Sequence, residues 1–341
     1  MKLPRITIVV PSYNQGHYLD ETLRSIFDQE YSNIELFVVD GGSSDNSEEI
    51  IGKHEEKINW WTSEKDSGQS EAINKGLKRA TGEIITWLNS DDLFAKNALT
   101  TIAAHFNAST SNIGLIHGGA EIFNSKKIIE TRFTYQAPNK EAYLSGMVLP
   151  QPASFFKKKF LDKTGLINEE LHYGMDYDLF LRLSLVSEFK PINDVLARYR
   201  LHEQSKSVSE SNRFIYDWKR SFVNLCKNLE WASEIDYLKK TSLFDQELDY
   251  FKAYTFQPEK SIINIINKQK TIFFHLGHVL KDLYWNNDLD KAKDLDDLLR
   301  KDFNKTWWEE DPRLKVVSSK LRYPRIALNT LKKIKRIIRK N

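Results

Sequence analysis

The chain has few of the features that would set it apart from ordinary globular proteins. Among its 341 residues there is a single cysteine, Cys226, which excludes an intramolecular disulfide and favours a reducing compartment. No apolar run approaches the roughly 20 residues that span a bilayer. The residues after Met1 contain no apolar stretch typical of a signal peptide. We therefore expect a cytoplasmic protein with one large core and a smaller second unit.

Acidic residues are absent from the last part of the chain. Residues 320–341 contain nine basic residues, whereas the whole chain has a net charge of only +3, so the remainder is net negative. Leu328, Leu331, Ile334 and Ile338 are spaced along one helical face, among lysines and arginines. This pattern is typical of peripheral binding to an anionic membrane surface, here the inner face of the cell membrane; a packed terminal helix and an unstructured tail are the alternatives. No recognised nucleic-acid-binding module accompanies it, so we expect no nucleic-acid partner.

The first hundred residues alternate between strand and helix patterns. Runs rich in β-branched and other apolar residues indicate strands, and segments with apolar residues three or four apart indicate helices. The strand-like runs are 5–10, 35–40, 58–62 and 84–88, and the helix-like segments are 18–29, 45–57 and 70–79. This βαβ alternation predicts an α/β fold with a parallel sheet that carries helices on both faces.

The pattern changes after about residue 113. The expected elements are short strands at 113–117 and 120–123 and helices at 177–187, 214–225, 243–254 and 262–284. The polar run 203–211 indicates either a domain boundary or a loop over the site. We expect three parts, namely an α/β domain (1–210), a mainly helical C-terminal region (211–318) and a basic amphipathic tail (319–341).

The most informative stretch is the apolar strand 84–88, which leads into the polar residues 89–92. In open α/β sheets, ligands bind at the carboxyl ends of the strands, where Asp40 ends another predicted strand. The adjacent carboxylates of Asp91 and Asp92 suit a divalent cation with phosphate oxygens, although the alternative is that they cap the next helix. A nucleoside diphosphate matches this edge, because Asp40 can accept a hydrogen bond from a base and a metal at Asp91 can neutralise the diphosphate.

Six blocks of the sequence resemble glycosyltransferase family 2, the inverting enzymes with a GT-A fold. The blocks are IVVPSYN (8–14), VVDGGSSD (38–45), DSG with AINKG (66–76), ATGE leading into LNSDD (80–92), MDYDLFLR (175–182) and YRLHEQS (199–205). Their order and spacing make the resemblance specific, and it covers roughly the first 210 residues. It implies a Rossmann-like, nucleotide-sugar-binding mixed sheet flanked by helices.

The resemblance also implies roles for single residues. Asp40 would bind the base of the donor, most often uracil in this family, and Asp66 would lie near the ribose and the diphosphate. Asp91 would hold a divalent metal (Mn²⁺ or Mg²⁺), with His202 near the metal or the diphosphate, and Asp176 would be the catalytic base. The other donor-binding residues would be Pro11, Tyr13, Asn14, Asn89 and Ser90, together with Asp91 itself.

Two positions depart from the family pattern. Asn89 stands at the first position of the Asp-X-Asp motif and brings no charge to a metal. Met175 replaces the acidic neighbour of Asp176, so a like charge that would raise the pKa of that carboxyl is missing, and burial or another neighbour must raise it. Nearby, Asp178 and Arg182 are four residues apart, which favours a structural ion pair.

These roles imply an inverting, metal-dependent glycosyltransferase that moves a sugar from a nucleotide-sugar donor to a glycan or lipid-linked acceptor. The setting implied is bacterial capsule, O-antigen or exopolysaccharide assembly. A nucleotidyltransferase is disfavoured because residues 12–16, after the first strand, contain neither Lys nor Arg. A catalytically impaired, nucleotide-sugar-binding scaffold is the alternative that Asn89 and Met175 leave open. For His202, a solvated loop position is the alternative to metal binding.

Overall fold

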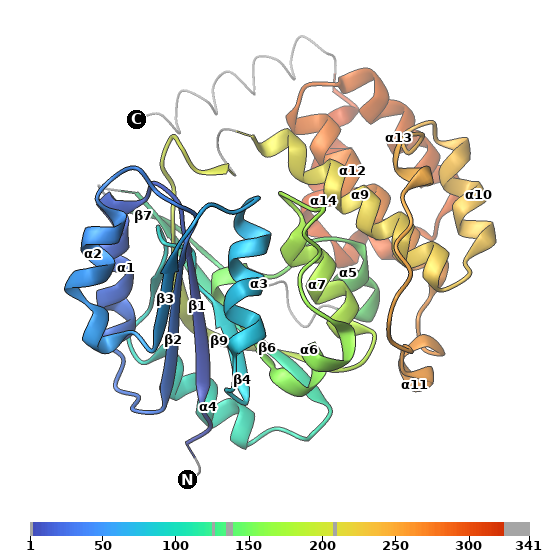
Figure 1. Cartoon of the computed structure of the whole chain (residues 1–341). Helices are drawn as coiled ribbons and strands as arrows, with labels where there is room; N and C mark the ends of the chain where they lie inside the picture. The colour runs from blue at the N-terminus through green and yellow to red at the C-terminus, as the bar shows by residue number, and fades with distance from the viewer. Residues whose placement is uncertain (1–2, 125–126, 134–138, 207–209, 324–341) are drawn as a thin grey trace.

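In the computed structural model of the chain, an α/β unit adjoins a helical region (Figure 1). The structure describes residues 3–124, 127–133, 139–206 and 210–323. In the colours of the figure, the α/β unit runs from blue to green and the helical region from yellow to red.

The described residues form a mixed sheet of nine strands in the order β3-β2-β1-β4-β8-β6-β9-β5, with β7 paired to β6. The strands are β1 (Ile6–Ser12), β2 (Ile34–Asp40), β3 (Trp60–Ser63), β4 (Ile84–Trp87), β5 (Leu93–Phe94), β6 (Ile113–Phe123), β7 (Ile128–Arg132), β8 (Ser154–Lys157) and β9 (Glu188–Arg200). The first four pair with one another in parallel, as their sequence pattern predicts. Because β8 runs antiparallel to both β4 and β6, the whole sheet is mixed.

Both faces of the sheet are covered. Side chains along β1 alternate between the faces, so that Ile8 belongs to one apolar cluster and Val9 to the other. The cluster around Ile8 includes residues of α1, α2 and α4, and the cluster around Val9 includes residues of α3 and α7. These helices and two shorter ones are α1 (Gly16–Phe27), α2 (Ser47–Lys53), α3 (Gln69–Arg79), α4 (Ala98–Asn107), α5 (Lys140–Ser145), α6 (Lys158–Thr164) and α7 (Met175–Ser184).

The C-terminal region packs against the α/β unit through α12, which contacts α5, and through α9, which lies beside α7 (Figure 1). Its helices are α9 (Ser211–Asn228), α10 (Ala232–Lys240), α11 (Lys260–Ile263), α12 (Lys268–Trp285), α13 (Leu289–Asp302) and α14 (Pro312–Leu321). Short 3₁₀ turns are η1 (Glu55–Lys57), η2 (Gln151–Ala153), η3 (Glu247–Asp249) and η4 (Lys305–Glu310). One apolar cluster extends from Val9 to Leu321, so both parts share a core. The division into separate domains stays a prediction.

The predicted helix at 243–254 is wrong, because the structure has only η3 there. Side chains of α9 bind the backbone of this segment instead. Lys219 and Lys227 donate to the carbonyl oxygens of Leu243 and Leu248, and Asn224 accepts from the N–H of Lys252. Those backbone groups are therefore bonded to α9.

The predicted helix at 262–284 is divided into α11 and α12. Asn267 ends the break, because its side chain accepts from the N–H of Lys270 and caps α12. The two short strands expected between 113 and 123 are one strand, β6, whose pairing with β9 shifts register near Gly118 and Gly119. A Cβ atom on Gly118 would lie 2.4 Å from the carbonyl oxygen of Asp194, so a glycine is needed for this close approach.

The predicted basic tail lies mostly outside the described residues. Of 319–341, the structure describes 319–323, and 319–321 form the end of α14. The membrane-binding role of the tail stays a prediction. Within the described part of the chain, no helix has both the length and the apolar character needed to cross a membrane.

Candidate active site

Three parallel strands carry predicted site residues to one edge of the sheet. The last residues of β1 and β2, Ser12 and Asp40, are register partners, and β4 ends two residues before Asn89. Pro11 is buried within β1, whereas Tyr13, just beyond it, is 63% exposed. The structure therefore brings the predicted donor-binding segments together at the carboxyl ends of these strands.

Asp91 and His202 are brought into contact. Oδ2 of Asp91 lies 2.9 Å from Nε2 of His202, and their side chains are 20% and 11% exposed. Residues 89–92 form the acidic turn after β4. Arg200 fixes this turn by donating its backbone N–H to Oδ1 of Asp92 (2.9 Å) and its Nε–H to the carbonyl oxygen of Asp91 (2.8 Å). The ring of Tyr18 lies 4.8 Å from that of His202. His202 is thus a packed side chain and not a solvated loop residue, and its role at a metal stays a prediction.

Asp92 has a different environment from Asp91. It has no exposed surface, and burial, with the charge of Asp91 beside it, raises the pKa of its carboxyl well above the usual range. Thr22 donates to the carbonyl oxygens of both Ser90 and Asp92, which ties the turn to α1. The next long helix, α4, begins at Ala98, so neither aspartate caps it.

Asn89 is hydrogen-bonded to the first residue of α3. Its Oδ1 accepts a hydrogen bond from Nε2 of Gln69 (2.8 Å), and its Nδ2 lies 3.5 Å from Oδ2 of Asp92. The amide at the first motif position therefore links α3 to the acidic turn.

Asp40 is enclosed by the turn that follows β2. Its Oδ2 accepts from the N–H groups of Gly42 (3.1 Å) and Ser43 (2.8 Å) and from Oγ of Ser63 (2.8 Å), and its Oδ1 accepts from Oγ of Ser43 (2.6 Å). The residue has no exposed surface. A base would reach this carboxylate only if the 41–43 turn moved, so the base-binding role of Asp40 stays a prediction.

The other predicted donor-binding residues lie around two loops, the first after β1 (13–15) and the second after β2 (41–46). Asn14, at φ 52°, accepts from the N–H of Ser44 (2.9 Å) and so ties the first loop to the second. Asp66 lies over Gly41, where an added Cβ would come 2.9 Å from its Oδ2. Burial raises the pKa of the Asp66 carboxyl, against a lowering effect from the N–H of Gly68. Close by, Oγ of Ser12 is buried without a hydrogen-bond partner, so this part of the site has unused hydrogen-bonding capacity.

Asp176 is the second residue of α7. Its Oδ1 accepts from the N–H of Tyr177 (2.7 Å). Burial raises the pKa of its carboxyl to about 6, and the charge of Asp217 adds to this effect, while Lys206 lowers it. The neighbouring Met175 contributes no charge, so burial and the charge of Asp217 raise the pKa of Asp176 in place of the missing acid. A carboxyl with a pKa near 6 is suited to accept a proton near neutral pH.

Lys206 connects the two sides of the site. Its Nζ lies 3.3 Å from Oε1 of Gln69 and 3.3 Å from the carbonyl oxygen of His172. Gln69 in turn binds Asn89, and His172 is four residues before Asp176. The acidic turn after β4 and the start of α7 therefore belong to one site.

The donor atoms present fit a divalent metal that arrives with a diphosphate. A carboxylate oxygen suits Mg²⁺ or Mn²⁺. The imidazole of His202 beside Asp91 favours Mn²⁺ over Mg²⁺, because nitrogen ligands suit transition metals. Among the residues that the structure describes, no group of three or more His, Cys, Asp or Glu side chains could hold a metal. Diphosphate and water would have to supply the remaining ligands, as is common for nucleotide-bound metals.

Sequence reasoning missed several residues of this site. Arg200 lies inside the block 199–205, and Gln69 lies inside the block 66–76, so local patterns point toward both. Asp217 lies on a helix far along the chain, and no local signal marks it. The expected structural ion pair is confirmed, with Asp178 and Arg182 2.9 Å apart and both buried.

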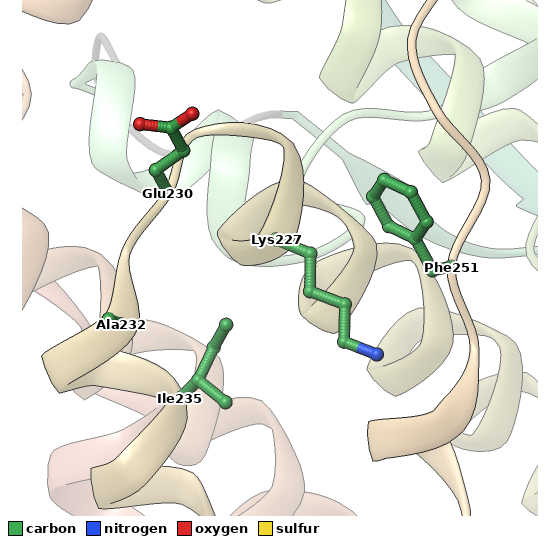
Figure 2. A pocket seen from close by; sticks show the side chains of 5 residues that line it. All are labelled: Lys227, Glu230, Ala232, Ile235 and Phe251. Carbon is green, nitrogen blue, oxygen red and sulfur yellow. The ribbon is translucent and has the colours of Figure 1, made fainter.

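A pocket of about 480 Å³ lies elsewhere, in the helical region (Figure 2). Its lining residues are Lys227, Glu230, Ala232, Ile235 and Phe251. None of the predicted site residues lines it, and the ammonium group of Lys227 is already bonded to the carbonyl oxygen of Leu248.

Comparison with known proteins identifies relatives of the chain. A glycosyltransferase of Rickettsia typhi, named as uncharacterized, is 27% identical over 270 residues, which cover 74% of this chain and 83% of that protein. The Escherichia coli UDP-Glc:alpha-D-GlcNAc-diphosphoundecaprenol beta-1,3-glucosyltransferase WfgD is 30% identical over 218 residues, covering 62% of this chain and 83% of WfgD.

The fold has solved counterparts. The crystal structure of S. aureus TarS in complex with UDP-GlcNAc aligns with a TM-score of 0.55 at 19% identity, covering 82% of this chain and 81% of that chain. At this identity the likeness concerns the fold alone, and it confirms the expected GT-A architecture. The family model described as Glycosyl transferase family 2 matches residues 7–165, which contain the strands and acids at the sheet edge. With that match, the fold and the similarity to WfgD, the chain belongs to glycosyl transferase family 2 and is a glycosyltransferase.

Proposed function

We propose that this chain is an inverting, metal-dependent glycosyltransferase that moves a sugar from a UDP-linked donor to a hydroxyl of a glycan or lipid-linked oligosaccharide. The observation that carries the proposal is the pairing of two chemically distinct centres in one site. Asp91 and His202 lie 2.9 Å apart at one side, and Asp176, whose pKa is raised to about 6, lies at the other.

Asp176 acts as the general base. Its ionised carboxylate takes the proton of the acceptor hydroxyl as that oxygen attacks the anomeric carbon, a role typically worth about 10²–10⁴-fold in rate. Attack comes from the face opposite the departing nucleotide, so one displacement inverts the anomeric configuration. Asp91 and His202 would hold the metal, which when bound would neutralise charge on the leaving diphosphate. The donor-binding residues of the two loops and of the acidic turn orient the nucleotide.

The names of the relatives support the choice of substrates. WfgD is named for a UDP-Glc donor and a diphosphoundecaprenol-linked acceptor, and a hyaluronan synthase of Pasteurella multocida is 23% identical over 316 residues. We infer that this chain works in surface polysaccharide assembly at the cytoplasmic face of the membrane. The basic tail would dock it near a lipid-linked acceptor.

The first experiment measures thermal stabilisation by a panel of nucleotides and nucleotide sugars, with and without Mn²⁺. A ligand that binds only the folded state raises its stability. We expect stabilisation by UDP or a UDP-sugar that depends on Mn²⁺ and is lost in Asp91→Ala. Stabilisation by GDP- or dTDP-sugars alone contradicts the UDP assignment. No stabilisation by any nucleotide contradicts both the enzyme proposal and the nucleotide-sugar-binding scaffold, whereas stabilisation without sugar transfer favours the scaffold.

The second experiment determines the stereochemistry. The anomeric configuration of the product from the donor identified above is read by NMR from the coupling constant at the new linkage. Inversion supports a single displacement with Asp176 as base, whereas retention contradicts it.

A further inference from the structure

The segment that leads into α7 is held by a side chain of the helical region. Oδ2 of Asp217, on α9, accepts hydrogen bonds from three consecutive backbone N–H groups, those of His172 (3.0 Å), Tyr173 (2.8 Å) and Gly174 (3.1 Å). Asp217 is 4% exposed, so little water competes for these bonds. Gly174 is the residue before α7, and Asp176 is the second residue of that helix. The carboxylate therefore fixes the backbone where the helix of the base begins.

The backbone at Gly174 approaches α9 too closely for a side chain. An added Cβ would lie 2.8 Å from Cβ of Asp217 and 3.0 Å from Cδ1 of Trp218. α9 and α7 lie beside each other at this point (Figure 1). The glycine thus allows the short distances on which the three hydrogen bonds depend.

A second link joins the same segment to the start of α9. The hydroxyl of Tyr173 donates to Oε2 of Glu210 (2.6 Å) and accepts from the guanidinium of Arg213 (2.8 Å). Residues 172–174 are therefore held through their backbone and through one side chain by the same helix. Two independent sets of contacts indicate that this segment has one fixed arrangement.

The charge of Asp217 is divided between two partners. Its Oδ2 faces the three amides, and its Oδ1 lies 3.7 Å from the guanidinium of Arg220. Arg220 also stacks over the ring of Tyr250, 4.1 Å from its centroid, and so is itself held in place. Of the charged groups near Asp176, Asp217 raises the pKa of its carboxyl and Lys206 lowers it.

We propose that Asp217 is a positioning residue for the transfer reaction: by fixing the backbone of residues 172–174, it holds Asp176 where that carboxylate receives the proton of the acceptor. The inference rests on the proposed role of Asp176 as the base. It makes α9, which lies beyond the residues matched by the family, part of the catalytic apparatus. Asp217 touches neither substrate nor reacting atoms in this proposal, and acts through α7.

The test is Asp217→Asn in the full chain. The amide keeps the size of the side chain and one oxygen for the three N–H groups, but it removes the charge that strengthens those bonds and places an NH₂ group against Arg220. We expect kcat to fall about 100-fold, because small displacements of a catalytic group cost rates of this order. The KM for the donor and the thermal stabilisation by UDP stay as in the wild type. The pH at which kcat reaches half its plateau moves below about 6, since the negative charge that raises the pKa of Asp176 is gone.

Gly174→Ala separates geometry from charge. The added methyl pushes the segment away from α9, so kcat falls, but Asp217 keeps its charge and the pH midpoint moves less than in Asp217→Asn.

The matched control is Asp296→Asn on α13. Asp296 is 3% exposed and pairs with Arg300 (2.9 Å), so its loss removes a similar buried ion pair outside the site. We expect that variant to lose stability and keep kcat.

Hydrogen–deuterium exchange supplies a readout that does not need activity. In Asp217→Asn, the amides of 172–174 exchange faster than in the wild type and in Asp296→Asn. A wild-type kcat in Asp217→Asn, an equal loss in Asp296→Asn, or unchanged exchange at 172–174 overturns the inference. If the wild type transfers no sugar, the proposed function fails and the positioning role fails with it, while the exchange data still decide whether Asp217 fixes the segment.

Discussion

Oδ2 of Asp91 lies 2.9 Å from Nε2 of His202, although 111 residues separate them in the chain. The contact forms because β5 and β9 are antiparallel neighbours and Arg200, at the end of β9, binds the backbone of the acidic turn. Two metal-ligand types are thereby placed side by side at the carboxyl end of β4, where a diphosphate would bring the remaining ligands.

The first prediction concerns these two side chains. In Asp91→Ala, UDP in the presence of Mn²⁺ binds at least about tenfold more weakly, and His202→Ala shows a smaller loss in the same direction. With UDP at 100 times its wild-type Kd, the wild type should gain about 2.7 kcal/mol of stability, and Asp91→Ala should lose about half of this gain or more. Denaturant unfolding with and without Mn²⁺ measures both quantities.

The control for that prediction is Asp162→Ala. Asp162 is an exposed acid on α6 that pairs with Lys158, away from the sheet edge. Its loss should leave the effect of Mn²⁺ unchanged. Equal metal dependence in Asp91→Ala and in the wild type would contradict the assignment of Asp91 as a ligand.

The second prediction concerns catalysis by Asp176. Asp176→Asn should lower kcat by about 10²–10⁴-fold with donor binding retained, because the amide cannot accept the proton. In the wild type, kcat should rise with pH through about 6 and then level off, since burial raises the pKa of this carboxyl to about 6 and only its ionised form is a base. Steady-state rates between pH 5 and 8 check both statements. A rate that is flat across this range would exclude Asp176 as the titrating base.

The third prediction concerns stability. The pKa of Asp176 is higher in the folded protein (about 6) than its ordinary value of 3.8, so the folded state binds this proton more tightly. Stability is therefore lost as pH rises from about 4 to about 6, and the full cost is present above that range. Asp176→Asn should be more stable than the wild type at pH 8, by at most about 3 kcal/mol, and nearly equal at pH 4. Urea unfolding at the two pH values tests this; a variant less stable at pH 8 would refute it.

The fourth prediction concerns Asp66. Gly41→Ala places a methyl group 2.9 Å from Oδ2 of Asp66, and this carboxylate must move because it is the flexible partner. We expect UDP to bind about tenfold more weakly, a loss of about 1.4 kcal/mol, if Asp66 contacts the nucleotide. Gly52→Ala is the control, because no atom lies within 4 Å of its added Cβ and a helix gains up to about 1 kcal/mol from the change. Titration calorimetry with UDP should separate the two variants.

Local sequence patterns predict the first half of the fold well. The strands near residues 5–10, 35–40 and 84–88 are present because a strand covered on both faces is a nearly continuous apolar run. The pattern is less informative in the helical region. The segment 243–254 has helical spacing, yet its backbone is bonded to lysine and asparagine side chains of α9, and this tertiary competition is invisible in a local window.

Local patterns in the chain are enough to predict which acids follow which strands and in what order the family blocks occur, because apolar runs and turn residues act over a few neighbouring positions. Which polar groups meet depends on the assembled fold. It enclosed Asp40 in its own turn, joined Asp91 to His202, and brought Asp217 to amides 43 to 45 residues before it. Such contacts depend on the order of strands in the sheet and on the packing of α9 against α7, because residues far apart in the chain become neighbours only after those elements have assembled.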